Sequence, residues 1–264
     1  MNPVLETIQQ RKSVRAYEDR PIPADVRLAI LDAAMRAPTA GNMMLYSVIE
    51  ITDQAAKDRL VETCDNQPFI ATAPWVLLFL ADYQRWYDFF QVSDVESYCV
   101  EQGTTLMQPQ EGDLFLACCD ALIAAQTAVI AAESFGVGSC YIGDILENFE
   151  IHQRMFDLPP YAVPIAMLCF GYPTEEQRVR EMTPRFSTEF VVYKDRYRRL
   201  SSQEFERMFA ARYAKIESSS SDRPNIALQM YKSKFSAEFS QEMRRSVSAI
   251  LRSWVAGTSG RDAD

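Results

Sequence analysis

The sequence predicts an α+β (mixed α/β) fold with layers of helices around one sheet. Short apolar runs at Ser47–Ile51, Trp75–Ala81 and Val163–Phe170 have the length and composition of buried strands. Predicted helices at Asp53–Glu62 and Leu114–Ala132 separate these runs, and another at Ala24–Ala37 precedes them. Strands that are separated by helices form layers around one sheet.

Local signals place the first helices. Asn2-Pro3 provides an N-cap and a proline at the first helical position, so a short helix should run to about Arg11. After Pro21 and Pro23, a second helix should cover Ala24–Ala37. Its apolar face is formed by Val26, Ile30, Ala33, Ala34 and Ala37. Asp53 should cap a third helix that ends near Glu62.

The middle of the chain is acidic and then strongly apolar. We expect Asp82–Asp113, with seven acidic residues and one arginine, to be irregular. Asp113 should cap a long helix that Gly136 ends. The helix is long enough to cross a membrane, but a carboxylate at Asp120 would be costly there. We therefore interpret this segment as a buried helix of a protein that lies outside the membrane.

Two regions are expected along the chain, residues 1–217 as the main domain and residues 218–264 as a linker with a helical C-terminal extension. Ser218–Ser221 has the composition of a flexible linker. Pro224–Trp254 has a helical apolar period. This amphipathic tail needs a surface to cover it, either on the main domain or on a partner subunit.

Composition excludes several classes of partner. The formal net charge of −9 argues against nucleic acid, because phosphate binding needs a basic surface. The six cysteines form no C-x-x-C pair and are expected to be reduced thiols packed as small hydrophobes. Met1–Gln10 lacks the pattern of a signal peptide, so a cytoplasmic location is expected.

Common catalytic motifs are missing from the sequence. There is one histidine, His152, which we expect to be packed or at the surface rather than catalytic. Neither a G-x-S-x-G elbow nor a phosphate-binding P-loop occurs, and Gly136-Val137-Gly138 lacks the third glycine of a dinucleotide fingerprint. We therefore predict neither a protein catalytic group nor a metal site.

Three segments remain as candidates for ligand binding. Arg11-Lys12-Ser13-Val14-Arg15 is either a solvated helix end or a phosphate site, since cations and a hydroxyl hold phosphate well. Pro38–Asn42 is either a simple helix stop or a loop of small residues that approaches a flat ligand. Gly136–Asp144 contains more glycines than a helix end requires, and Gly143 could direct its N–H toward a ligand. A basic stretch, Arg178–Arg199, has seven cationic and three acidic residues.

Taken in order, these segments resemble the FMN-dependent nitroreductase family over Val4 to about Leu200. Residues 11–15 look like the opening R-x-S-x-[RK] motif, and residues 37–42 (APTAGN) look like the A-P-S-x-x-N loop. Residues 136–143 (GVGSCYIG) look like the G-x-G-S-C-W-I-G turn, and Pro184-Arg185 looks like the late P-[KR] step.

The resemblance implies a role for each matching residue. Arg11, Ser13 and Arg185 should contact the FMN phosphate, and Arg15 should lie near the pyrimidine edge of the flavin. Thr39, Ala40 and Asn42 should line the ring, Asn66 should face its polar edge, and Ile142 and Gly143 should cover it near N5. The complete cofactor-binding set that we expect is Arg11, Lys12, Ser13, Arg15, Pro38, Thr39, Ala40, Asn42, Asn66, Tyr141, Ile142, Gly143 and Arg185.

The resemblance also implies the fold, a central mixed sheet wrapped by helices, and the function. It implies an oxidoreductase that takes hydride from NADH or NADPH and passes it to a small aromatic or quinone-like acceptor by a ping-pong mechanism. A homodimer with FMN at the interface is expected. Asn42 is followed by Met43-Met44-Leu45-Tyr46 rather than the family's x-Q-P-W, so the acceptor stays open. The alternatives are a specialised dehalogenation or dehydrogenation, a flavin-binding protein with little turnover, and an interaction protein without a cofactor.

Overall fold

The computed structural model describes residues 2–217 and 225–257. Contacts divide the chain into two compact units, one formed by Met1–Arg180 with Gln241–Asp264 and the other by Glu181–Ser240. The two units are described separately. The linker expected at Ser218–Ser221 lies outside the described residues.

A four-stranded sheet forms the centre of the first unit. Its strands are β1 (Tyr46–Glu50), β2 (Trp75–Asp82), β3 (Gly138–Ile142) and β4 (Ala162–Gly171), in the order β1-β2-β4-β3. All three pairings between these strands are antiparallel. A mixed sheet was expected. In the described residues the one parallel pairing is the isolated bridge between Ser13 and Ser139.

Both faces of the sheet are covered. Trp75, Leu77 and Phe79 of β2 belong to a core cluster with α2 (Ala24–Met35) and α7 (Glu111–Ser134). Val76 and Leu78 belong to a second cluster with α3 (Gln54–Thr63) and α4 (Phe69–Thr72). This alternation follows from the period of two along a strand. Since every residue of β2 is buried, the expectation of a strand covered on both faces is confirmed.

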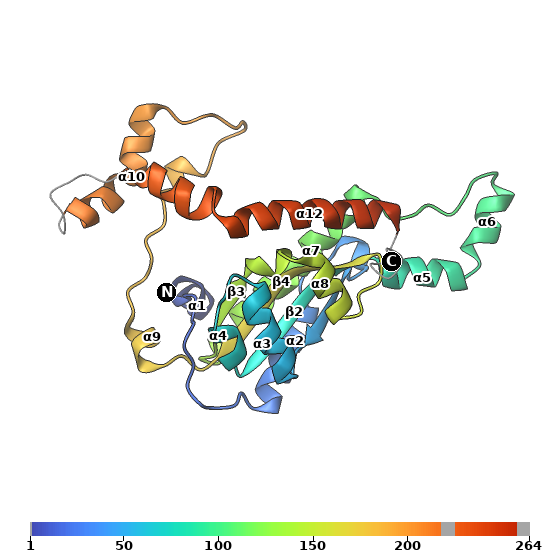
Figure 1. The fold of residues 1–264 in the computed structure, drawn as a ribbon, viewed down its shortest axis with the longest axis horizontal. Helices are drawn as coiled ribbons and strands as arrows, with labels where there is room; N and C mark the ends of the chain where they lie inside the picture. The colour runs from blue at the N-terminus through green and yellow to red at the C-terminus, as the bar shows by residue number, and fades with distance from the viewer. Residues whose placement is uncertain (1, 218–224, 258–264) are drawn as a thin grey trace. The chain divides into compact units, whose positions relative to one another are not determined.

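Figure 1 shows the helices around this sheet. In the first unit they are α1 (Pro3–Gln10), α2 (Ala24–Met35), α3 (Gln54–Thr63), α4 (Phe69–Thr72), α5 (Gln84–Val92), α6 (Val95–Glu101), α7 (Glu111–Ser134), α8 (Phe149–Met155), α9 (Glu175–Val179) and most of α12 (Glu238–Ala256). The 3-10 turns are η1 (Ala40–Asn42) and η2 (Gly143–Leu146). The expected caps at Asn2 and Asp53 are confirmed, because each side chain accepts from the first turn of its helix.

The long helix α7 is fixed at both ends. Gln110, not Asp113, is the N-cap, and the carboxylate of Asp113 accepts from the Gln110 N–H at 2.8 Å in a capping box. Gly136 has φ +70°, and the Val137 N–H donates to the Ala132 carbonyl at 3.0 Å, which gives a Schellman end. By length and composition α7 could cross a membrane. Its buried alanines instead pack against the sheet.

Two sequence predictions are corrected here. Asp82–Asp113 is not irregular throughout, because it contains α5 and α6, which project from the sheet in Figure 1. Residues 138–142, expected as part of a turn, form strand β3 along β4. Pairing with a long neighbouring strand overrides the weak strand propensity of a five-residue segment that begins with glycine.

The C-terminal helix α12 packs on its own chain. Ser246, Ile250 and Trp254 are buried. The Trp254 indole N–H donates to the Gln110 carbonyl at 3.0 Å, and the Ser246 hydroxyl accepts from the Phe149 N–H at 3.0 Å. These residues of α12 are thus covered by the first unit of the same chain.

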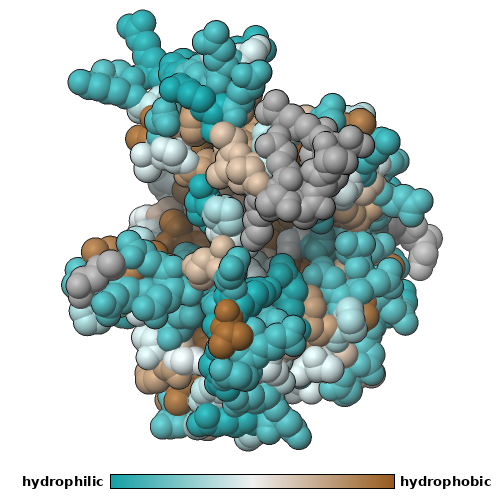
Figure 2. All heavy atoms as spheres, turned by 90° about the vertical axis from the view of Figure 1, so that its left-hand side faces the viewer, coloured by the Kyte–Doolittle hydropathy of each residue, from teal (hydrophilic) through white to brown (hydrophobic). Residues whose placement is uncertain are grey.

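The second unit contains η3 (Thr188–Phe190), α10 (Ser202–Glu217), α11 (Ile226–Met230) and a π-helical turn, η4 (Tyr231–Phe235). The ring of Phe186 lies 5.2 Å from that of Phe209, and the Arg212 guanidinium lies over both. On the face drawn in Figure 2, hydrophilic residues predominate, as expected for a chain of net charge −9.

Candidate cofactor site

The basic segment that follows α1 lies along strand β3. Ser13 bridges to Ser139, and the Val14 N–H donates to the Ser139 carbonyl at 2.9 Å. The approach is so close that a Cβ on Gly138 would lie 2.5 Å from a methyl group of Val14. Glycine at this position therefore allows the basic segment to reach the sheet.

Several cations gather around this segment. Arg11, Arg15 and Arg180 all oppose the effect of burial, which raises the pKa of the Cys140 thiol. Arg180 also donates to the Ser13 carbonyl at 2.5 Å. The Lys12 ammonium donates to the carbonyls of Arg178 and Arg180 at 2.7 and 2.6 Å, so it ties the two basic segments together.

Arg180 is a candidate site residue that the sequence motifs did not include. Its position in the basic stretch Arg178–Arg199 was the available signal, but that stretch offers seven cations and only one motif match, Arg185. Arg185 is exposed and belongs to the second unit, whereas the other candidates belong to the first.

The inner wall beside the cations contains Glu133 and Tyr141. Burial raises the pKa of Glu133, while Arg11 and Lys12 lower it. Burial also raises the pKa of Tyr141, again opposed by Arg11. The positive charge of Arg11 thus acts on both groups, and an anion is a ligand that would complement it.

A second group of candidates meets at the end of β3. Gly143 is exposed, and a Cβ there would face open space, while Ile142 is buried. Gln67, which follows Asn66, donates to the Asp144 carboxylate at 2.7 Å. The structure thus brings the turn of Asn66, an exposed residue with φ +50°, to the turn of Gly143.

Arg15 joins this group from the basic segment. Its guanidinium carbon lies 5.9 Å from the centroid of the Phe69 ring at the start of α4, three residues beyond Asn66. The Arg15 N–H donates to the Gln177 side chain at 3.3 Å. Cations, an asparagine and an open glycine therefore share one region at the edge of the sheet.

The early loop Pro38–Asn42 is held by a buried carboxylate. Asp120 of α7 is 3% exposed and accepts from the Ala40 and Leu45 N–H groups, each at 3.1 Å, and from the Thr39 hydroxyl. Charge-assisted bonds of this kind are among the stronger ones in proteins. Sequence analysis noted Asp120 only as an obstacle to membrane insertion, since a lone carboxylate in an apolar helix does not reveal its partners.

Within one chain, the early loop and the basic segment lie near different positions along α7. Asp120 and Glu133 are thirteen residues apart on α7, and at 1.5 Å per residue this is about 20 Å. Thr39 and Ala40 are anchored at the first position, and Arg11 and Lys12 act on the second. The residues predicted for one site therefore form two clusters in a single chain.

The departure after Asn42 has a structural role. The Trp86 indole donates to the Met43 carbonyl at 2.7 Å, and Arg85 donates to the carbonyls of Met44 and Tyr46 at 3.3 and 3.1 Å. Residues 43–46 are thereby attached to α5. The acidic segment is thus coupled directly to the early loop.

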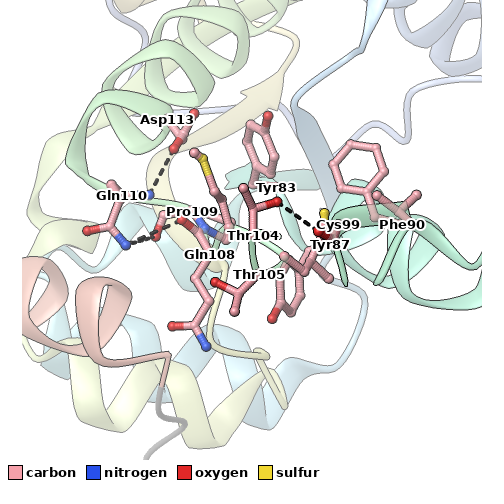
Figure 3. A pocket seen from close by; sticks show the side chains of 13 residues that line it. Tyr83, Tyr87, Phe90, Cys99, Thr104, Thr105, Gln108, Pro109, Gln110 and Asp113 are labelled. Atoms are coloured by element: carbon pink, nitrogen blue, oxygen red, sulfur yellow. Dashed lines mark hydrogen bonds between the residues drawn. The ribbon is translucent and has the colours of Figure 1, made fainter. Parts of the chain in front are cut away.

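Helices α5 and α6 also border a cavity of about 1120 Å³. Figure 3 shows the aromatic rings of Tyr83, Tyr87 and Phe90 on one side, and residues 104–110 on the other. Gln110 and Asp113, which cap α7, close one end. The cavity is aromatic and hydroxyl-rich, and Asp113 is its one acidic lining residue.

The described residues contain no group of three or more His, Cys, Asp or Glu side chains that could hold a metal ion. The single histidine is fully buried. Its Nδ1 donates to the Ile145 carbonyl at 3.0 Å, and burial lowers its pKa to about 4. His152 is thus a packed, neutral residue.

Comparison with known proteins decides the family. The model of the nitroreductase family matches residues 8–172, which include residues 11–15, the early loop and all four strands of the sheet. This chain belongs to the nitroreductase family.

Relatives of this nitroreductase-family protein extend over most of the chain. It is 30% identical to an oxygen-insensitive NADPH nitroreductase of Salmonella typhimurium over 204 residues, which are 77% of this chain and 78% of the relative. It is also 30% identical to an FMN reductase [NAD(P)H] of Bacillus subtilis over 197 residues, 75% of each chain. The solved structure of B. megaterium NfrA2 has a TM-score of 0.81 at 25% identity, covering 97% of this chain and 98% of that one.

Proposed function

We propose that this nitroreductase-family protein is an FMN-dependent oxidoreductase. In this proposal it takes hydride from NADH or NADPH and passes it to a small aromatic or quinone-like acceptor by a ping-pong mechanism. Family membership and relatives named as an NADPH nitroreductase and an NAD(P)H-dependent FMN reductase support it. The observation that carries it is the Arg11–Arg15 segment, which lies on β3 beside the open turn at Gly143.

The residues of this region fit FMN. Arg11, Ser13 and Arg180 all act on the Cys140 thiol and so lie in one region. Two guanidinium groups and a hydroxyl suit a phosphate dianion, and Lys12 and Arg185 would add to it. Gly143 leaves room for a flat ring to approach the backbone, with Ile142 and Tyr141 next to it. Arg15 and Asn66 supply polar contacts at the same edge.

The protein would act by binding and positioning. When bound, FMN supplies the two-electron redox chemistry. The chain holds the phosphate, places a cation at the ring edge and lines the pocket. We assign no catalytic residue that attacks substrate covalently, since burial raises the pKa of the Cys140 thiol and keeps it protonated.

We further propose a homodimer whose interface completes each FMN site. Support comes from the two clusters held about 20 Å apart along α7, because Pro38, Thr39, Ala40 and Asn42 of a second copy would then supply the missing wall. Exposed apolar side chains also form a stripe on α7, at Phe115, Leu116, Leu122 and Ile123. Exposed apolar stripes of this kind mark interaction surfaces.

Initial-velocity kinetics test the catalytic proposal. With NADH or NADPH varied at several concentrations of a quinone, the ping-pong mechanism predicts parallel double-reciprocal lines. A panel of nitroaromatics, quinones and halogenated phenols would then identify the acceptor class. Intersecting lines, or turnover confined to a halogenated phenol, would favour a different flavin reaction on this scaffold. A cytoplasmic location is part of the same proposal and is tested by cell fractionation.

A further inference from the structure

The carboxyl group of Glu147 is buried directly after the turn η2. The residue is 4% exposed, and its Oε1 atom has no hydrogen-bond partner. An ionised carboxylate without donors is strongly disfavoured in such a place. Glu147 therefore carries a proton in the folded protein.

Other carboxylates surround Glu147 and explain why the proton resides there. Asp144 forms a hydrogen bond with it, and Asp65 and Glu242 face it. Asp144 already accepts from Gln67 at 2.7 Å. Asp144 therefore has a hydrogen-bond donor, whereas the Oε1 atom of Glu147 has none. Burial and these negative neighbours raise the pKa of Glu147 to about 8.

Glu242 and Arg245 of helix α12 form an ion pair with each other, so this arginine is not a counter-charge for Glu147 alone. Glu242 accepts from the Asn148 N–H at 3.2 Å and from Arg245 at 2.8 Å. Arg245 also donates to both oxygens of Glu150, each at 2.8 Å. The charge of Arg245 is thus shared by two other carboxylates.

Two further buried groups of this region, His152 and Cys64, are neutral. His152 of α8 is neutral at neutral pH, since burial lowers its pKa to about 4. Burial raises the pKa of the Cys64 thiol, and both Asp144 and Glu147 raise it further. Glu147 therefore holds its proton near pH 7, with the Asp144 carboxyl group beside it.

The pair lies next to the candidate ring edge. Asp144 is half-buried and follows Gly143, whose Cβ position faces open space. Gln67 connects Asp144 to the turn that contains Asn66. A path thus leads from buried Glu147 through half-buried Asp144 to the open side of the Gly143 turn.

The proposed reaction needs a proton from such a path. NADH or NADPH gives up a hydride, which is two electrons and one proton, whereas a quinone that becomes a hydroquinone takes two electrons and two protons. We propose that the Asp144–Glu147 pair stores the second proton and delivers it to the acceptor. The O–H bond of Glu147 breaks as Asp144 gains the proton, Asp144 releases a proton to the acceptor oxygen, and solvent reprotonates the pair. This inference rests on the proposed function.

The test compares E147Q and D144N with E62Q as a control in the purified holoenzyme, because Glu62 is an exposed carboxylate paired with Arg59. Glutamine mimics protonated Glu147 in shape but cannot release its proton. Acceptor reduction is measured with a quinone and with ferricyanide, which takes electrons without protons. We expect E147Q and D144N to slow quinone reduction roughly 10- to 100-fold, at or below the usual range for general acid catalysis. Neither variant should change ferricyanide reduction, and E62Q should match the parent with both acceptors.

The pH profile separates proton storage from a structural role. Quinone reduction by the parent should fall as pH rises through about 8, the pKa of Glu147, and E147Q should lack that inflection. Isotope-edited NMR of the carboxyl carbons should show one glutamate that titrates far above the ordinary range and disappears in E147Q. Equal slowing with both acceptors, or an unchanged quinone profile in E147Q, would overturn the inference. A parent that retains no FMN would instead refute the proposed function.

Discussion

At the scale of single residues, Asp120 determines the shape of the early loop. Replacing it with asparagine removes the charge from three bonds that hold Thr39, Ala40 and Leu45. Bonds to charged groups contribute about 1.5–3 kcal/mol each, so D120N should lower the free energy of unfolding by about 2 kcal/mol or more. Urea denaturation measures this, with D58N as the control because Asp58 is exposed. Equal midpoints for the two variants would show that Asp120 does not anchor the loop.

Glu147 also predicts how stability depends on pH. Its pKa is about 8 in the folded protein against an ordinary value of 4.5, so the folded state binds more protons between these values. The free energy of unfolding should therefore fall as pH rises through this window, by on the order of a few kcal/mol. His152 acts in the opposite direction, since its pKa of about 4 lies below the ordinary 6.5 and its contribution is lost as pH falls between them.

The pH prediction is checked by urea unfolding of the parent and E147Q across this range. Glutamine has no proton to lose, so E147Q should gain stability relative to the parent as pH rises from about 4.5 to 8. Stability curves that run parallel over the whole range would contradict the assignment.

At the scale of elements, the contact between the basic segment and β3 leaves almost no room for a larger side chain. G138A would place a methyl group 2.5 Å from a Val14 methyl, so the segment must shift. We expect the variant to retain FMN less tightly than the parent, because Arg11 and Ser13 would leave their positions. Gly112 is the matched control, since an added Cβ meets nothing there. Equilibrium dialysis of FMN measures the effect, and equal affinity in G138A and G112A would contradict it.

Helix α12 should contribute to the stability of the domain itself. Trp254 is fully buried, donates to the Gln110 carbonyl and meets the Tyr161 ring edge-on at 5.5 Å. W254A should cost about 3–5 kcal/mol of unfolding free energy, as typical for buried aromatic residues. L251A, which truncates a half-buried side chain on the same helix, should cost less. A cost for W254A no larger than that for L251A would mean that the tail does not stabilise the domain.

At the scale of the whole molecule, the sequence predicted the elements with clear local signals and missed those decided by distant contacts. The strands at β1, β2 and β4 were predicted because apolar runs reveal them, as were the caps at Asn2 and Asp53. Strand β3 was missed because only its pairing with β4 identifies it. Helices α5 and α6 were missed because a polar, acidic composition hides short helices.

The site was predictable to the same degree. Motif order placed Arg11, Ser13 and Gly143 in one site, and the structure brings their segments to one region. Periodicity and spacing do not show that Asp120 holds the early loop, or that Glu147 lies among Asp144, Asp65 and Glu242. Such contacts join residues that are far apart in the chain.

The most direct test of the account is an anaerobic titration of the purified, FMN-reconstituted protein, followed by its visible absorbance. The account predicts that FMN binds tightly and that its absorption band bleaches on addition of NADH or NADPH and returns on addition of a quinone. Protein that takes up no FMN, or bound FMN that neither nicotinamide bleaches, would contradict it.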